Sequence, residues 1–153
     1  MIFFEWKDAY ELGLPDIDLQ HTMIVNMLNE LHAARKDGES DKVAERTLGK
    51  MLLYVEEHFN TEENAMRAQG FPGIEAHIVE HEVFRAKVHA LHEKHYQQSA
   101  IVSDDLVTIL MTWLKDHIAE VDQDFGRFVR ERSEEARKKF FSECNPPQPG
   151  ENR

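Results

Sequence analysis

Four segments of the sequence carry apolar residues at steps of three and four, the spacing that places side chains on one face of an α-helix. These segments lie at residues 19–36, 43–69, 77–95 and 106–128. No stretch shows the alternation of apolar and polar residues that is typical of a β-strand. Because short connections join the four segments, we expect an all-α fold, an antiparallel up-down four-helix bundle.

Signals at the ends of these segments indicate where the bundle begins and ends. Pro15, followed by acidic residues, favours the start of the first helix, and the irregular arm before it carries apolar anchors. The anchors are Phe3, Phe4, Trp6 and Tyr10. We expect the fourth helix to continue beyond the bundle. The chain is therefore divided into a bundle at residues 1–132 and, at 133–153, a helical extension followed by a disordered tail.

The composition excludes several classes of protein. The chain has 153 residues and a formal charge of −11, with 18 Lys and Arg against 29 Asp and Glu, so we expect no nucleic-acid binding. Cys144 is the single cysteine, which excludes an internal disulfide and a thiolate zinc site. No apolar run is long enough to span a bilayer, and the first residues lack the basic start of a secretory signal. We expect a soluble, cytoplasmic monomer.

Nine histidines are the unusual feature of the composition, and five of them fall on inward helix faces together with two carboxylates. Each histidine taken alone is most simply a core residue paired with a neighbour. Burying all of these side chains together is costly, because each unpaired polar group in a protein interior costs several kcal/mol. A metal ion removes that cost by accepting the lone pairs. The expected ligands are His21, His58, Glu62, His77, His81, His117 and Asp122.

The types and the number of these residues limit the metal centre. Imidazole and carboxylate ligands suit iron, and also zinc, copper or nickel. Seven side chains are too many for one ion, so the set fits two ions with carboxylate bridges.

The spacing in the fourth helix presents a difficulty. His58 and Glu62 are four residues apart, as are His77 and His81, but His117 and Asp122 are five apart. Five steps of a straight α-helix leave two side chains roughly 140° apart. Either the two converge from opposite edges of the inward face, or a π-helical turn realigns them. The continuous apolar stripe through Trp113 and Val121 favours the first arrangement.

The ligand pattern resembles that of the hemerythrins, in particular the single-domain bacterial members. The supporting segments are similar too: the aromatic arm, IDLQH around His21, HFNTEENAM from His58, HEVF from His81 and WLKDHI before Asp122. The resemblance covers residues 4–130.

This resemblance implies a non-haem di-iron site that binds O2 reversibly. By position it assigns His77, His81 and His117 to one iron and His21 and His58 to the other. Glu62, Asp122 and a solvent-derived oxo or hydroxo group bridge the two. One coordination position is then open, on the iron held by two histidines, and O2 would bind there.

Apolar residues beside the ligands are candidates for the O2 pocket, because the matching positions in the family form an apolar pocket over the open site. They are Ile24, Phe59, Trp113, Leu114 and Ile118. Plain core packing explains each of them singly just as well. We expect His89, His92 and His95 on a solvated face and His32 partly buried.

The ligand types favour a binding protein over an enzyme. Five of the seven ligands are neutral imidazoles, whereas di-iron oxidases and ferritins are rich in carboxylates. Three alternatives stay open: a di-iron enzyme that is an oxidase or consumes peroxide or NO, a sensor of oxygen or iron, and iron storage. A sensor usually carries an output domain, for which 153 residues leave no room. Storage needs a cage assembly and a carboxylate-rich entry path.

Overall fold

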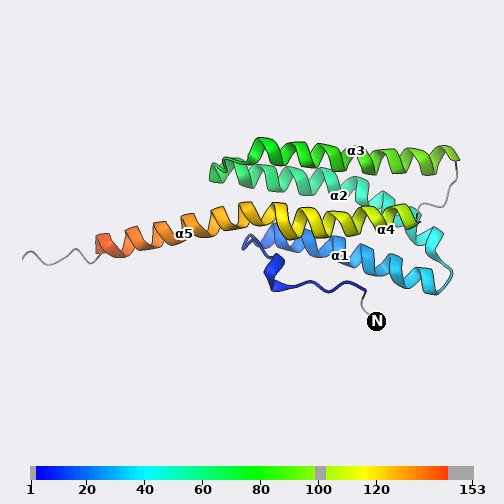
Figure 1. The fold of residues 1–153 in the computed structure, drawn as a ribbon, viewed down its shortest axis with the longest axis horizontal. Coiled ribbons are helices and arrows are strands. Elements are labelled where there is room, and N and C mark those ends of the chain that lie inside the picture. Colours follow the sequence, from blue (N-terminus) through cyan, green and yellow to red (C-terminus); the bar gives the residue numbers. More distant parts are fainter. Residues whose placement is uncertain (1–2, 99–102, 145–153) are drawn as a thin grey trace, which may run out of the picture.

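The structure, a computed structural model, describes residues 3–98 and 103–144. A short 3-10 turn, η1 (Asp8–Tyr10), lies in the N-terminal arm. The helices that follow are α1 (Pro15–Lys36), α2 (Ser40–Gln69), α3 (Ile74–Gln98), α4 (Ser103–Thr112), η2 (Trp113–Val121) and α5 (Asp122–Cys144). The last three continue into one another and form one long helix (Figure 1). The described residues contain no β-strand, and the predicted all-α four-helix bundle is confirmed.

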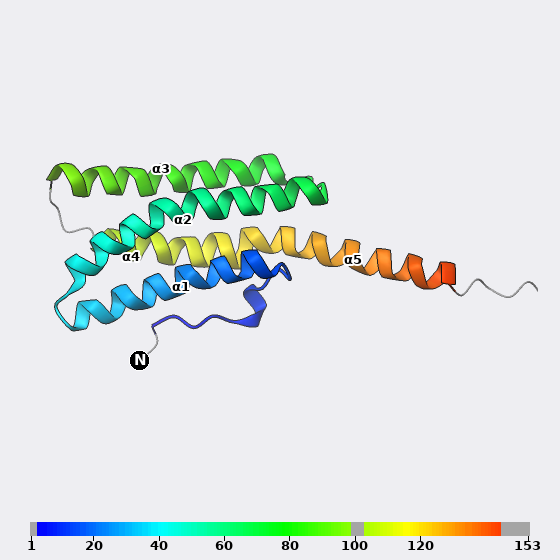
Figure 2. The ribbon, with the colours of Figure 1, turned by 180° about the vertical axis from the view of Figure 1, so that it is seen from behind.

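The helices pack as neighbours in an up-down arrangement. α1 packs against α2 and α4, and α2 packs against α3. Both views show the N-terminal arm along the outside of α1 and α5 reaching beyond the ends of the other helices (Figures 1 and 2). α5 continues to Cys144, and its residues 130–144 are exposed. The division of the chain at residue 132 stays a prediction. The predicted disordered tail lies outside the described residues.

Local signals explain where the helices begin and end. Pro15 occupies the first position of α1, where its missing N–H costs nothing and its fixed φ suits a helix. α2 ends at Gly70, whose φ of 67° is left-handed and therefore suits glycine. The Gly70 N–H donates to the Arg67 carbonyl at 3.1 Å, and the Phe71 N–H donates to the Met66 carbonyl at 3.0 Å. This cap ends the helix sharply and lets the chain turn into α3.

Two side chains of α1 hold the arm in place. Asp18 accepts hydrogen bonds from the backbone N–H of Leu12 at 2.7 Å and of Gly13 at 3.1 Å. Further along α1, Asn29 accepts from the Phe4 N–H at 2.9 Å and donates to the Phe4 carbonyl at 2.9 Å. The arm is therefore an ordered cover over α1.

The arm also makes a close contact with α5. Leu12 is fully buried, and a Cβ added at Gly126 would lie 3.2 Å from the Leu12 Cα. Gln123 donates through Nε2 to the Tyr10 carbonyl at 3.0 Å. Glycine at position 126 thus permits the arm to lie directly against the helix.

Two apolar clusters occupy successive levels of the bundle. The larger one contains Leu28, Val55, Val88 and Leu110, and the smaller one contains Leu12, Ile17, Met66 and Phe125. Along every helix the predicted ligands lie near the point where residues of the larger cluster give way to residues of the smaller one. The polar site is therefore enclosed by apolar side chains on both sides. None of the described helices combines the length and apolar character needed to cross a bilayer.

Replacing Asp18 by Ala should release the arm from α1. We expect the free energy of unfolding to fall by about 1–3 kcal/mol, because two backbone N–H groups lose a charged acceptor. Urea denaturation measures this. The matched control is Asp16→Ala in the same helical turn, where Asp16 is exposed and the loss is limited to a helix-dipole term below about 1 kcal/mol. Equal losses in the two variants would contradict the anchoring role of Asp18.

Candidate metal centre

The structure brings all seven predicted ligand residues together in the bundle core. His21 comes from α1, His58 and Glu62 from α2, His77 and His81 from α3, His117 from η2, and Asp122 from the first position of α5. None is more than 3% exposed.

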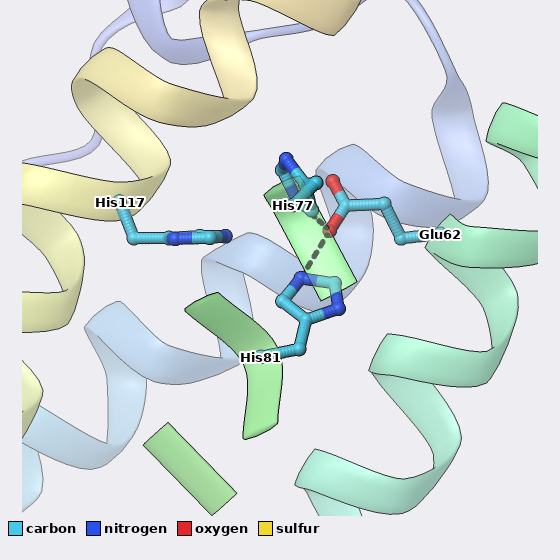
Figure 3. Close-up of side chains that lie close together, drawn as sticks. All are labelled: Glu62, His77, His81 and His117. Atoms are coloured by element: carbon cyan, nitrogen blue, oxygen red, sulfur yellow. Dashed lines mark hydrogen bonds and ion pairs between the residues drawn. The ribbon is translucent and has the colours of Figure 1, made fainter. Parts of the chain in front are cut away.

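Three histidines and Glu62 form the first of two groups, which Figure 3 draws. Glu62 Oε2 lies 3.3 Å from His77 Nε2 and 3.1 Å from His81 Nε2. His117 faces them across the core, with its ring centroid 4.8 Å from that of His77. The ligand atoms of all four lie within 4.8 Å of one another, a spacing that suits a single metal ion.

The second group consists of His21, His58 and the same Glu62. The rings of His21 and His58 have their centroids 4.8 Å apart, and His58 Nε2 lies 3.7 Å from Glu62 Oε2. Because Glu62 belongs to both groups, its carboxylate stands where it could serve two ions.

Asp122 connects the two groups through its two oxygens. Oδ1 lies 3.1 Å from His77 Nε2 and 3.0 Å from His117 Nε2, in the three-histidine group. Oδ2 lies 3.2 Å from His21 Nε2, in the two-histidine group. One carboxylate therefore presents one oxygen to each group, which is the arrangement required of a bridging ligand.

A π-helix brings His117 and Asp122 to the same side of the chain. The nine residues Trp113–Val121 of η2 are π-helical, and the Asp122 N–H donates to the His117 carbonyl five residues earlier. Residues five apart are thus related here as residues four apart are in an α-helix. The expectation that an ordinary α-helix suffices was wrong. The stripe that supported it shifts by one position, because Ile118 and Asp122 are buried while Val121 is only half-buried.

Buried polar atoms of the cluster without well-formed hydrogen bonds fit a site that holds a cation. Its nitrogen–oxygen pairs are close, but Nε2 of His21, His58, His81 and His117 has no hydrogen-bond partner. Both oxygens of Asp122 and one of Glu62 also have none. Leaving so many buried groups unsatisfied costs several kcal/mol each. The donor set of imidazoles and carboxylates fits iron, whose ions accept these lone pairs.

The pKa values of the two carboxylates also fit a site for a cation. Burial raises the pKa of Asp122, but the charge of His117 and contacts with His117, His21 and His77 outweigh it and hold that pKa well below its ordinary value. Burial and the charge of Asp122 likewise raise the pKa of Glu62, yet contacts with His77 and His81 lower it to about 2. Both carboxylates are therefore anions inside the core, and they require positive charge beside them.

The pKa values of two histidines in the cluster are shifted in opposite directions. Burial lowers the pKa of His58 to about 3, so its imidazole is neutral and suited to bind a metal. Burial also disfavours charge on His77, but Asp122 and Glu62 outweigh it and raise the pKa of His77 to about 9. The two carboxylates therefore stabilise positive charge at His77.

Two residues that the sequence did not single out orient the ligand rings. His58 Nδ1 pairs with Gln20 Oε1 at 2.9 Å, and His81 Nδ1 pairs with Glu63 Oε1 at 3.0 Å. Each partner fixes the ring so that Nε2 faces the cluster. Gln20 is the sequence neighbour of His21 and yet bonds a histidine on another helix, so helical spacing offered no signal for this contact.

The five candidate O2-pocket residues are all buried in the larger apolar cluster. Phe59 stacks on the His81 ring with centroids 3.9 Å apart, and Trp113 stacks on the His117 ring at 3.7 Å. Ile24, Leu114 and Ile118 are no more than 1% exposed. They form apolar surroundings for the ligands.

The other histidines lie away from this cluster. His32 is half-buried, as expected, and stacks on Phe3 with ring centroids 4.0 Å apart. His89 is exposed, but His92 and His95 are half-buried and line a surface hollow, so the predicted solvated face holds for His89 and only in part for the other two.

Comparisons with known proteins agree with this geometry. Residues 12–129 match the family described as Hemerythrin HHE cation binding domain. The chain is 35% identical over 130 residues to a bacteriohemerythrin of Stenotrophomonas maltophilia, covering 85% of this chain and 84% of that protein. For a bacteriohemerythrin of Clostridium acetobutylicum the identity is 29%, with 80% of this chain and 98% of that protein covered. A crystal structure of a hemerythrin point mutant superposes with a TM-score of 0.73 at 28% identity, covering 84% of this chain and 98% of that one. The chain belongs to the hemerythrin family.

Proposed function

We propose that the protein binds O2 reversibly at a non-haem centre of two iron ions and acts as an oxygen carrier or store. The observation that carries this proposal is the position of Asp122, whose two oxygens face two separate histidine groups. A site for a single ion does not require one carboxylate whose two oxygens face two separate histidine groups. The resemblance to bacteriohemerythrins supports iron as the metal.

The two groups would hold one iron each. His77, His81 and His117 would hold the first ion and His21 and His58 the second, while Glu62 and Asp122, with an oxo or hydroxo group from solvent, would serve both. The second group offers one histidine fewer, which would leave a coordination position for a small molecule. When bound, the iron pair supplies two electrons and this position for reversible O2 binding.

The surrounding residues favour holding O2 over consuming it. Ile24, Phe59, Trp113, Leu114 and Ile118 keep water and protons away from the ligands, because they fill the core with apolar atoms. The ligand set is mostly neutral imidazole, unlike the carboxylate-rich sets of di-iron oxidases. We therefore propose a monomeric binding protein without enzymatic activity.

Optical spectra of the reduced, iron-loaded protein test this function. We expect admission of air to produce a visible charge-transfer band and removal of O2 under argon to abolish it over repeated cycles. A band that never returns to the reduced spectrum, or steady O2 consumption with a reductant, would favour the enzyme alternative.

Replacing either bridging carboxylate should remove more metal than replacing any single surface histidine. Glu62→Ala and Asp122→Ala each take a ligand from both ions, so we expect iron content to fall from two per chain to below one. The control is His89→Ala, an exposed residue outside the cluster. Elemental analysis after gel filtration measures the content, and equal iron loss in His89→Ala would disprove the assignment.

Removal of the metal should destabilise the fold. The unpaired nitrogens and oxygens in the core lose their partner, and metal binding contributes directly to folding free energy. We expect a markedly lower melting temperature for the chelator-treated protein than for the iron-loaded one by circular dichroism. Identical melting curves for the two forms, with metal content verified, would contradict a structural role for the ions.

A further inference from the structure

The two histidine groups differ in the charge of their outer hydrogen-bond partners. His81, in the three-histidine group, bonds through Nδ1 to the carboxylate of Glu63 at 3.0 Å. His58, in the two-histidine group, bonds through Nδ1 to the amide oxygen of Gln20 at 2.9 Å. In both rings Nε2 is buried and faces Glu62 Oε2 in the cluster, at 3.1 Å from His81 and 3.7 Å from His58. The two contacts share a geometry and differ in charge.

The carboxylate of Glu63 lies where solvent screens its charge poorly. The side chain of Glu63 is 14% exposed and that of His81 is fully buried, so the charge of the carboxylate is felt more strongly than it would be in water. A carboxylate acceptor on one ring nitrogen makes the other nitrogen a stronger electron donor to a metal. An amide acceptor orients the ring equally well but adds no charge.

Each outer partner is held in turn by its own neighbours. Arg67, one turn further along α2, lies 3.3 Å from Glu63 Oε2 and is about half exposed. Gln20 donates through Nε2 to Thr61 Oγ1 at 3.3 Å, and Thr61 donates to the Glu57 carbonyl at 2.8 Å. These contacts place Glu63 and Gln20 in defined positions, as the tuning of a metal ligand requires.

We propose that Glu63 is a positioning and tuning residue that lowers the reduction potential of the iron pair through His81. Negative charge delivered through the imidazole stabilises the ferric state of the three-histidine ion. The neutral Gln20 leaves the two-histidine ion, which has the open position, without that added charge. The inference rests on the proposed function, because it assumes that both groups hold iron.

Glu63→Gln tests the charge while keeping an oxygen that can accept from His81. We expect two irons per chain as in the unmodified protein, and a reduction equilibrium shifted about tenfold towards the ferrous state. That shift corresponds to about 59 mV for a one-electron couple. Spectroelectrochemical titration of the iron-loaded protein measures it. Gln20→Glu should shift the equilibrium in the opposite direction.

Two variants separate this contact from a general effect of charge. Glu57→Gln removes the same charge from an exposed position next to His58 and should change the potential far less. Arg67→Gln removes the counter-charge of Glu63 and should lower the potential, opposite in sign to Glu63→Gln. An equal shift in Glu57→Gln and Glu63→Gln would overturn the proposal.

A measurement on the zinc-loaded protein checks the hydrogen bond without redox chemistry. The Nδ1 proton of His81 should resonate at lower field in the unmodified protein than in Glu63→Gln, because a carboxylate accepts a stronger bond than an amide. An unchanged resonance or an unchanged potential in Glu63→Gln would overturn the tuning role of Glu63 and would leave the proposed function intact. Failure of the unmodified protein to bind iron would overturn the proposed function, and this inference with it.

Discussion

The burial of five imidazoles and two carboxylates in one small core is the constraint on which the rest of the structure depends. Most of their inward-facing atoms lack well-formed hydrogen bonds, and both carboxylates are anions in the protein interior. Burial on these terms is costly unless cations complete the site. Apolar layers lie on both sides of the cluster, and the outer partners of His58 and His81 orient their rings.

Much of the fold and of the cluster could be predicted from local spacing. The helix start at Pro15 and the stop at Gly70 follow from residue types that favour these positions. Four-residue spacing placed His58 with Glu62 and His77 with His81, because both pairs lie in regular α-helix. His21 falls on an inward helix face by the same reasoning, whereas the five-residue spacing of His117 and Asp122 does not fit an α-helix.

The apolar pattern did not predict the π-helix. Trp113, His117 and Val121 stay in phase with an α-helix, and one extra residue per turn moves the buried positions only to the adjacent Ile118 and Asp122. The informative signal was the five-residue spacing of His117 and Asp122, which a straight α-helix cannot align. Gln20 and Glu63 were missed for another reason: their contacts join different helices, and only three-dimensional packing determines them.

Anomalous diffraction from crystals of the iron-loaded protein, recorded at the iron absorption edge, tests the central claim most directly. The account predicts two iron peaks, one among His77, His81 and His117 and one beside His21 and His58, both within bonding distance of the Asp122 carboxylate. A single peak, or an Asp122 side chain that contacts neither ion, would contradict it.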